Sequence, residues 1–337
     1  MRLPAFDYLS PENLGDALEL LSKHRGEAAI LAGGTDLLVR MKQRLTKPAF
    51  LISLKGIKEL NRIRHEEDAT HIGAMTPLVR MLEDDELRVR YPALVKAVGL
   101  IGASGIQHFR GTIGGNLCLQ TRCLYYNQSA FWRSGRTPCH KDKGETCYAE
   151  ENSDRCRSAN QSDGACALMA LGATVIAASA RGEHEMPIEA FFTGRGETPF
   201  DIEPDELVTE IRLPRPGKGV GSGFHKLTFR SAIDFALVSS SARVSLSGDR
   251  ITEGRIAVGG AGAAPLLLSE AAERLKGKNP RDAGAIEETA DQVMRHASAF
   301  TVHNLGATLE YRRRMLAVVT KRAIREAIEK ALWRAED

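Results

Sequence analysis

Apolar residues recur at helical spacing near the start of the chain. Leu14, Ala17, Leu18 and Leu21 fall on one face, after Ser10 and a proline at the first helical position, which predicts a capped amphipathic helix. Short apolar runs over 28–32 and 50–54 predict two strands. Residues 1 to about 55 are therefore expected to form a small α/β unit.

The middle of the chain alternates helical and extended patterns. Helices are predicted over 79–82 and 93–100, and residues 168–180 are expected to pass from a helix into a strand. A strand over 207–213 ends at Pro214. The proline and glycines that follow, Pro216, Gly217, Gly219 and Gly221, predict a domain boundary.

The last third begins with strands and ends with a helix. Strands are predicted over 243–246 and 255–258, with Asp249 at the turn between them. A stripe of apolar residues over 309–332 predicts a long amphipathic helix. Its basic run, 312–314, is expected to be a solvated face.

Composition excludes several classes of protein. The 337 residues, 43% hydrophobic and 26% charged, are typical of a globular protein of two or three domains. The net charge of +3 is too small to favour nucleic acid or an anionic membrane as partner. The longest apolar stretch, 165–180, contains Gly172 and Thr174, so no membrane span is expected. No secretory signal is recognised, and a cytoplasmic location is expected.

All six cysteines lie within one segment of 49 residues, in a stretch that is polar and rich in lysine and arginine: Cys118, Cys123, Cys139, Cys147, Cys156 and Cys166. A loop of about 40 residues with little apolar pattern needs a function or a bound metal to order it. None of the gaps matches a zinc knuckle or a bacterial ferredoxin. Spacing alone leaves structural zinc, an iron–sulfur cluster and unligated thiols open, with His140 as a further zinc ligand or a solvated residue.

Two glycine loops precede and begin this segment. Residues 28–38, AAILAGGTDLL, place adjacent glycines after a strand, and 110–117, RGTIGGNL, repeat the threonine and glycine pair. Such loops let backbone amides approach a pyrophosphate, so an extended phosphate-bearing cofactor is predicted. Neither is a G-x-G-x-x-G or Walker motif, which disfavours a Rossmann fold and a P-loop. Gly194 and Gly196, and the glycines of 258–265, are interpreted as turns.

The motifs AGGTDL, GTIGGN, SDGACALMALGA and FFTGRGET, in this order, resemble the FAD-binding subunits of the xanthine dehydrogenase (molybdenum hydroxylase) family over nearly the whole chain. The stretch LCLQTRCLYYNQSAFWRSG, continuing to Cys139, KDKGETC and SDRC, resembles the extra cluster-binding loop in the beta subunits of 4-hydroxybenzoyl-CoA reductases. The resemblance implies a [4Fe-4S] cluster and an FAD.

The resemblance also assigns site residues. It implies the cluster ligands Cys123, Cys139, Cys147 and Cys156, which leaves Cys118 and Cys166 as small buried thiols. For FAD it implies the backbone of the two loops, an acid near the cofactor and a lysine toward the ring: Ala32, Gly33, Gly34, Thr35, Asp36, Thr112, Gly114, Gly115, Asn116, Asp163 and Lys226. His108 and Phe109 replace an arginine and asparagine common in relatives, so flavin contacts from that stretch are not assigned.

The fold implied is α+β: a two-subdomain FAD-binding domain of the vanillyl-alcohol oxidase/PCMH type, then a C-terminal α/β domain of the CO dehydrogenase flavoprotein type. The expected divisions are residues 1–55, 56–217 with the cluster insert at about 119–160, and 218–337.

The function implied is electron transfer. A donor such as ferredoxin would supply electrons, which pass to [2Fe-2S] centres in a small subunit and to molybdopterin in a large one, within a dimer of heterotrimers. No catalytic residue is expected in this chain. The rivals are the FAD subunit of an oxidative hydroxylase of purines, aldehydes or heteroaromatic rings that passes electrons to NAD or a quinone, and a zinc-stabilised binding module.

Overall fold

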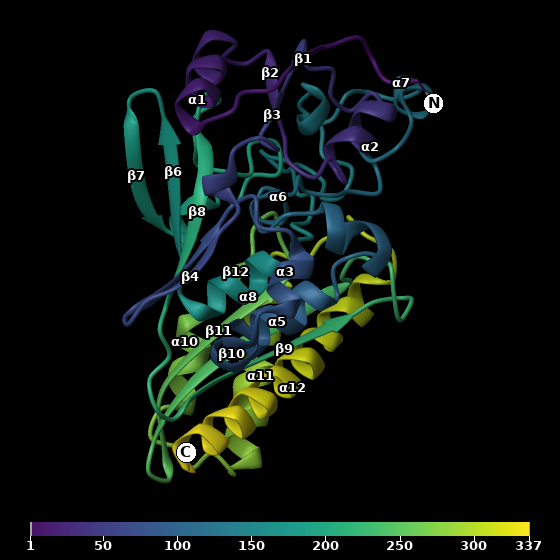
Figure 1. The fold of residues 1–337 in the computed structure, drawn as a ribbon. Coiled ribbons are helices and arrows are strands. Elements are labelled where there is room, and N and C mark those ends of the chain that lie inside the picture. Colours follow the sequence, from purple (N-terminus) through teal and green to yellow (C-terminus); the bar gives the residue numbers. More distant parts are fainter. Residues whose placement is uncertain (1, 337) are drawn as a thin grey trace.

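Three separate sheets organise the chain, and the computed structural model describes residues 2–336 (Figure 1). The first sheet is parallel, in the order β1-β3-β2, and consists of β1 (Asp7–Leu9), β2 (Ala28–Leu31) and β3 (Phe50–Ser53). Helix α1 (Leu14–Lys23) buries its predicted apolar face, and α2 (Leu37–Lys42) follows the first glycine loop. The predicted start of α1 was wrong: Asn13, not Ser10, caps it by accepting the Asp16 N–H at 2.9 Å.

The second sheet is antiparallel, in the order β4-β5-β8-β6-β7. Its strands are β4 (Ile63–His65), β5 (Ala69–Gly73), β6 (Thr174–Ser179), β7 (Gly182–Pro187) and β8 (Leu207–Pro214). Short helices connect them: η1 (Lys58–Leu60), α3 (Leu78–Glu83), α4 (Asp85–Arg90), α5 (Pro92–Gly99), η2 (Ser104–His108), α6 (Ile113–Leu117), α7 (Ala130–Ser134), η3 (His140–Asp142), α8 (Asp163–Leu171) and α9 (Ile188–Phe191).

The third sheet is antiparallel, in the order β12-β11-β10-β9, with β9 (Val220–Leu227), β10 (Val238–Ser247), β11 (Arg250–Gly259) and β12 (Leu266–Leu267). It is followed by α10 (Ser269–Ala272), η4 (Glu273–Leu275), α11 (Ala283–Ser298) and α12 (Leu309–Glu336). Helix α12 lies directly on β9 and β10 (Figure 1). A Cβ on Gly223 would lie 2.5 Å from the Ala323 carbonyl oxygen, so glycine permits this close packing.

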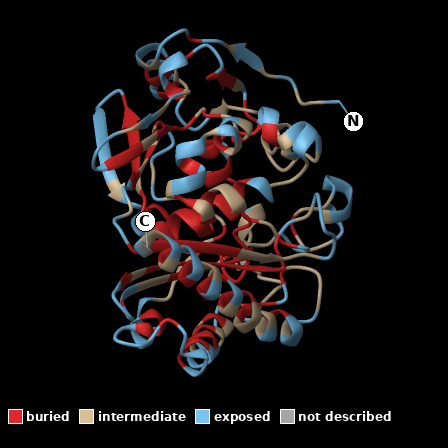
Figure 2. Cartoon of the chain, turned by 60° about the horizontal axis from the view of Figure 1, so that its bottom comes forward, coloured by how far each residue is buried: buried red, intermediate tan, exposed pale blue. Residues whose placement is uncertain are grey.

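The opposite face of β9 joins the core of the central helices. Phe224 alternates with Gly223 and is fully buried in the same cluster as residues of α5 and α8. Figure 2 shows the buried residues along the sheets and central helices, with exposed positions on outer helical faces and loops. Within the described residues, no helix is both long and apolar enough to span a membrane.

The irregular segment after Pro214 ends before Val220, and Gly221, one of the glycines that predicted a boundary here, lies inside β9. One sequence expectation about the C-terminal part was wrong. Arg312 is 0% exposed rather than solvated. Its guanidinium donates to the carbonyls of Leu237, Val302 and Gly260 and to Asn304 Oδ1, because the start of α12 sits against loop ends whose carbonyls have no sheet partner there.

Candidate functional site

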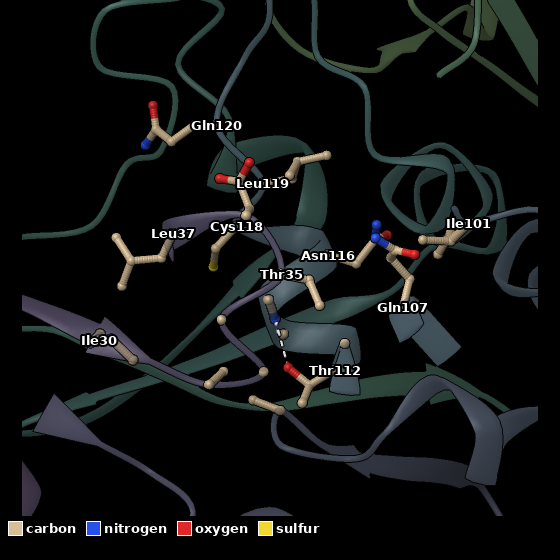
Figure 3. Close-up of a pocket in the computed structure, with 18 of the residues that line it drawn as sticks. Ile30, Thr35, Leu37, Ile101, Gln107, Thr112, Asn116, Cys118, Leu119 and Gln120 are labelled. Carbon is tan, nitrogen blue, oxygen red and sulfur yellow. Dashed lines mark hydrogen bonds between the residues drawn. The ribbon is translucent and has the colours of Figure 1, made fainter. Parts of the chain in front are cut away.

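The two glycine loops meet and line one cavity of about 460 Å³. The first loop joins β2 to α2, and the second leads into α6. A Cβ on Gly33 would lie 1.7 Å from the Arg110 carbonyl oxygen, so the loops touch only because residue 33 is glycine. Gly34 adopts φ +73°, the left-handed region that glycine favours. Figure 3 shows Thr35 from the first loop and Thr112 from the second among the residues that line the cavity.

The first loop presents backbone donors to the cavity. Among the described residues, no group accepts the N–H of Gly33, Gly34, Thr35 or Asp36 at hydrogen-bonding distance. In the second loop Thr112 Oγ1 accepts the Gly115 N–H at 3.1 Å and caps α6. A run of free amides beside glycines is suited to the oxygen atoms of a pyrophosphate.

Buried polar atoms on the other wall also lack partners. Gln161 Oε1, Asp163 Oδ1 and Arg122 Nε are buried without a hydrogen bond, and all three residues line the cavity. Buried polar groups are nearly always paired in folded proteins. Together with the free amides, these atoms fit a polar, phosphate-bearing ligand such as FAD.

Asp163 and Lys226 form a buried ion pair next to the cavity. Lys226 Nζ donates to Asp163 Oδ2 at 2.6 Å and to the Leu100 carbonyl at 3.0 Å. Burial raises the pKa of Asp163 to about 6, although the Lys226 charge and hydrogen bond oppose the rise. Asp163 lines the cavity and Lys226 does not, so the lysine holds the carboxylate from behind.

Ten of the eleven predicted flavin residues line this cavity, all except Lys226. The sequence reasoning missed further lining residues, including Ile101, Gln107, Arg122 and Phe235. Gln107 points toward the cavity from the turn of η2, one position before His108 (Figure 3). His108 itself is buried and Phe109 is 62% exposed, and neither lines the cavity. The local sequence pattern does not predict that Gln107 lines the cavity, because its position depends on the π-helical turn.

The four predicted cluster ligands line a second, narrow cavity. Cys123, Cys139, Cys147 and Cys156 all contribute to it, with Tyr125, Tyr126, His140, Tyr148 and other residues. Burial raises the pKa of Cys123 to about 12, and the nearby thiols of Cys156, Cys147 and Cys139 add to the rise. Four thiols far apart in the sequence are thus brought together.

A tight loop places Cys139 next to Cys147. An isolated bridge pairs Cys139 with Thr146, and the Gly144 N–H donates to the Cys139 carbonyl at 2.9 Å. A Cβ on Gly144 would lie 1.9 Å from the Pro138 carbonyl oxygen, so the glycine of KDKGETC is required for this turn. His140 Nε2 bonds the Ser153 carbonyl at 2.9 Å.

The thiols do not form a site for a single metal ion. Within the described part of the chain, no group of three or more His, Cys, Asp or Glu side chains is placed to hold one ion. The two remaining cysteines lie elsewhere. Cys118 lines the larger cavity, and Cys166 is fully buried in α8, as expected of a small core residue.

The two cavities share a wall. Arg122 lines the larger cavity and the next residue, Cys123, lines the smaller one. On the facing segment Ser158 lines the smaller cavity and Gln161 the larger. The segments are joined by reciprocal backbone hydrogen bonds of 2.8 Å between Arg122 and Ala159. One short pair of extended segments therefore separates the thiols from the glycine-loop cavity.

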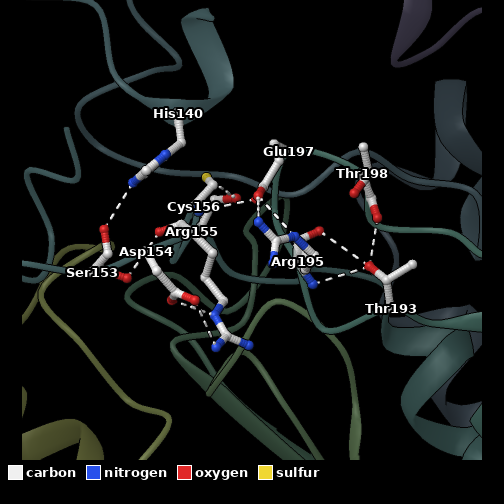
Figure 4. A network of polar contacts seen from close by, with 10 residues as sticks. His140, Ser153, Asp154, Arg155, Cys156, Thr193, Arg195, Glu197 and Thr198 are labelled. Carbon is white, nitrogen blue, oxygen red and sulfur yellow. Dashed lines mark hydrogen bonds and ion pairs between the residues drawn. The ribbon is translucent and has the colours of Figure 1, made fainter. Parts of the chain in front are cut away.

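The FFTGRGET loop holds Cys156 from the other side (Figure 4). The Cys156 N–H donates to Glu197 Oε2 at 3.0 Å, and the Gly196 N–H donates to the Cys156 carbonyl at 3.0 Å. Arg195 donates to Glu197 Oε1 and fixes the carboxylate. The loop, interpreted from sequence as turns only, thus also positions a thiol.

Comparison with known proteins gives two family matches. Residues 4–216 match the family described as "FAD binding domain in molybdopterin dehydrogenase", and residues 224–327 match "CO dehydrogenase flavoprotein C-terminal domain". Together the matched ranges include the α+β fold and nearly the whole chain.

Individual relatives agree. The chain is 30% identical to the nicotinate dehydrogenase FAD-subunit of Eubacterium barkeri, over 81% of this chain and 80% of that protein. It is 27% identical to the caffeine dehydrogenase subunit beta of Pseudomonas sp. (strain CBB1), over 98% and 97%. The solved carbon monoxide dehydrogenase of Hydrogenophaga pseudoflava contains a chain that superposes with a TM-score of 0.78 at 26% identity, covering 98% of this chain and 99% of that one.

Proposed function

Since this chain is an FAD-binding medium subunit of the xanthine dehydrogenase and CO dehydrogenase family of molybdenum hydroxylases, we propose that it relays electrons between FAD and a [4Fe-4S] cluster in a complex that resembles 4-hydroxybenzoyl-CoA reductase. The observation that carries the proposal is the wall shared by the two cavities, with all four predicted thiols on one side and the glycine loops on the other.

Ten residues of the larger cavity would hold FAD. The free amides of residues 33–36 suit the pyrophosphate, whereas the N–H groups at the start of α6 already donate within the protein. Asp163, held by Lys226, would hydrogen-bond the cofactor. Bound FAD exchanges one or two electrons, which lets it join a two-electron reaction to one-electron carriers. The chain contributes position and electrostatics, and no residue of it needs to act as acid or base on an organic substrate.

Cys123, Cys139, Cys147 and Cys156 would hold the cluster as thiolates, which a [4Fe-4S] centre requires. A bound [4Fe-4S] cluster takes up and releases one electron. Burial is the main cause of the raised pKa of Cys123, and the three other thiols add to it because they lie nearby. The insert supplies positive side chains nearby: Lys141, whose charge interacts with Cys156 and Cys123, and Arg136, which lies over the ring of Tyr148 in the cavity wall.

The assembly is proposed from relatives and from the resemblance of the insert. Relatives are named as a FAD-subunit, a beta subunit and a medium chain, which supports partner subunits for this chain. We propose a molybdopterin-binding large subunit, a [2Fe-2S] small subunit and a ferredoxin-like donor, arranged as a dimer of heterotrimers. The expected divisions at residues 55 and 217 remain part of this proposal.

The ligand assignment is tested with two cysteine variants of the full chain purified without oxygen. Cys147→Ser should lose most of its iron and keep its flavin, because it removes one of four thiolates and leaves the larger cavity intact. Cys166→Ala is the matched control. It removes a thiol from the α8 core, so it should lower thermal stability and keep its iron. Equal iron content in both variants would contradict the assignment.

A further inference from the structure

A chain of buried hydroxyl groups leads from Cys156 to a lysine. Cys156 Sγ lies 3.1 Å from Ser158 Oγ, which lies 2.6 Å from Thr121 Oγ1. Lys141 Nζ donates to Thr121 Oγ1 and, at 3.0 Å, to the Thr121 carbonyl. Ser158 and Thr121 are 0% and 1% exposed, so water does not compete for these contacts.

The lysine has no anionic partner in the protein. Among the described residues no carboxylate oxygen lies within 4.0 Å of Lys141 Nζ. Ionised thiols at Cys156 and Cys123 would favour its charge, whereas Arg40 and Arg122 oppose it. A largely buried ammonium group without a counter-ion is costly unless negative charge accumulates nearby. Ionised thiols in the cysteine cavity can supply that negative charge.

The hydroxyl chain can take two hydrogen arrangements with the same heavy-atom positions. With a neutral thiol, Cys156 donates to Ser158, Ser158 to Thr121, and Thr121 to the Gly196 carbonyl at 2.9 Å. With a thiolate, each hydroxyl rotates by its own free torsion. Ser158 then donates to the sulfur, Thr121 to Ser158, and Lys141 to Thr121, so every hydrogen points toward the negative charge.

Gly196 keeps the chain aligned. A Cβ at this position would lie 2.2 Å from Ser158 Oγ and 2.8 Å from Cys156 Sγ, so only glycine leaves room for both groups. The second glycine of FFTGRGET therefore has a reason beyond its turn: its backbone fits against the sulfur and the hydroxyl, and its carbonyl accepts the Thr121 hydrogen.

We propose that Lys141, acting through Thr121 and Ser158, is a positioning residue that stabilises negative charge at Cys156 and so raises the reduction potential of the centre bound by the four thiolates. The inference rests on the proposed cluster. Reduction adds one negative charge to the centre, and hydrogen bonds to a ligand sulfur backed by a cation favour that charge. Removing the Lys141 charge or interrupting the hydrogen bonds through Thr121 and Ser158 should make the reduced centre less favourable.

The test compares midpoint potentials, followed by EPR during redox titration of the full chain purified without oxygen. Lys141→Met and Ser158→Ala should each shift the potential of the centre to a more negative value. Lys143→Met, which removes the same charge at an exposed position two residues away, should leave it unchanged. Flavin content and the thermal midpoint show that each variant is folded.

The double variant Lys141→Met/Ser158→Ala distinguishes an effect transmitted through the hydroxyl chain from a direct effect of the lysine charge. If Lys141 acts through the hydroxyls, Lys141→Met should shift the potential much less in the Ser158→Ala background than in the native one. The same shift of the potential in both backgrounds, or no shift in either, would contradict the role of the hydroxyl chain without contradicting the proposed cluster. Absence of iron from the native protein would contradict the proposed cluster, and with it the proposed role of Lys141. A variant that binds iron poorly is assessed by its rate of iron loss to a chelator, which should exceed that of Lys143→Met.

Discussion

Arg312 carries its charge inside the C-terminal domain, where four oxygen acceptors surround its guanidinium. Burial lowers the pKa of Arg312 to about 10, with Arg313 contributing to the shift. Three of the acceptors are backbone carbonyls at the ends of loops, so this side chain replaces the hydrogen bonds that a sheet would provide. We assign Arg312 a structural role, as the residue that fixes the start of α12.

Arg312→Met should destabilise the protein by about 3 kcal/mol or more, since it leaves several buried acceptors unpaired. The control is Arg314→Met. Arg314 is exposed, and its one ion pair among residues 2–336 is with Glu310 one turn away, so its loss should cost no more than about 0.5 kcal/mol. Urea unfolding of both variants measures the difference. Equal midpoints would show that the buried contacts of Arg312 contribute nothing.

Asp163 should make the stability of the flavin-free protein depend on pH. Because its pKa is raised to about 6 from 3.8, folding favours the protonated carboxyl. This contribution is complete below about pH 4 and is lost as pH rises through about 6. Asp163→Asn cannot ionise, so between pH 4 and pH 7 it should gain stability relative to the native protein, on the order of 2 kcal/mol.

The measurement is the free energy of unfolding of both proteins at several pH values in that range. A constant difference would argue that Lys226 compensates the burial of the carboxylate completely. The same variant should also bind FAD more weakly, because the amide cannot offer the charged oxygen that now lacks a partner.

At the scale of elements, α12 and β9 pack so closely that two glycines of the strand become part of the interface. A Cβ on Gly221 would lie 2.1 Å from the Ala327 carbonyl, and one on Gly223 would lie 2.5 Å from the Ala323 carbonyl. Both neighbours are backbone atoms of a long helix, which cannot move aside as a side chain can. The other face of the same strand packs Phe224 on the central core.

Gly223→Ala should therefore destabilise the protein by about 2 to 3 kcal/mol, as overpacking does. Gly217→Ala is matched to it, since a Cβ at residue 217 meets nothing within 4 Å and its backbone is not in the left-handed region. Calorimetry of the two variants tests the contrast. A larger loss in Gly217→Ala than in Gly223→Ala would contradict the packing described for this interface.

Local patterns predicted most elements but not their pairing. The strands over 28–32, 50–54 and 207–213 lie within two residues of their predicted bounds, because apolar runs and flanking prolines mark them. No local signal indicates that β5 pairs with β8, more than 130 residues later. The helix start at Asn13 was missed because Ser10 and Pro11 also match the pattern of a cap and first helical residue. Only the structure shows that Asn13 accepts the Asp16 N–H.

At the scale of the whole molecule, cavity-lining residues that belong to sequence motifs were predictable, and those brought to the cavity only by the fold were not. The glycine loops were found because close approach requires glycine, and the cysteine segment because the crowding of six cysteines is unusual. The choice of four of these cysteines rested on the family resemblance. Gln107 and Arg122 were missed because their place depends on a π-helical turn and on a bridge between distant segments. The buried Arg312 was missed because its acceptors come from four separate positions.

The two adjacent cavities give the molecule its central feature. The paired segments at Arg122 and Ala159 lie between the four thiols and the glycine loops. Arg122 lines one cavity and the next residue, Cys123, lines the other. If both groups are bound, electrons have a short path between them inside one subunit. Electron transfer of this kind requires both cofactors in the same chain.

The most direct test is to purify the full chain without oxygen and to measure its visible spectrum, flavin, iron, acid-labile sulfide and zinc on one sample. We predict one FAD with about four irons and four sulfides per chain. Flavin without iron would contradict the electron relay and favour the FAD subunit of an oxidative hydroxylase, and zinc without flavin would contradict both cofactor assignments.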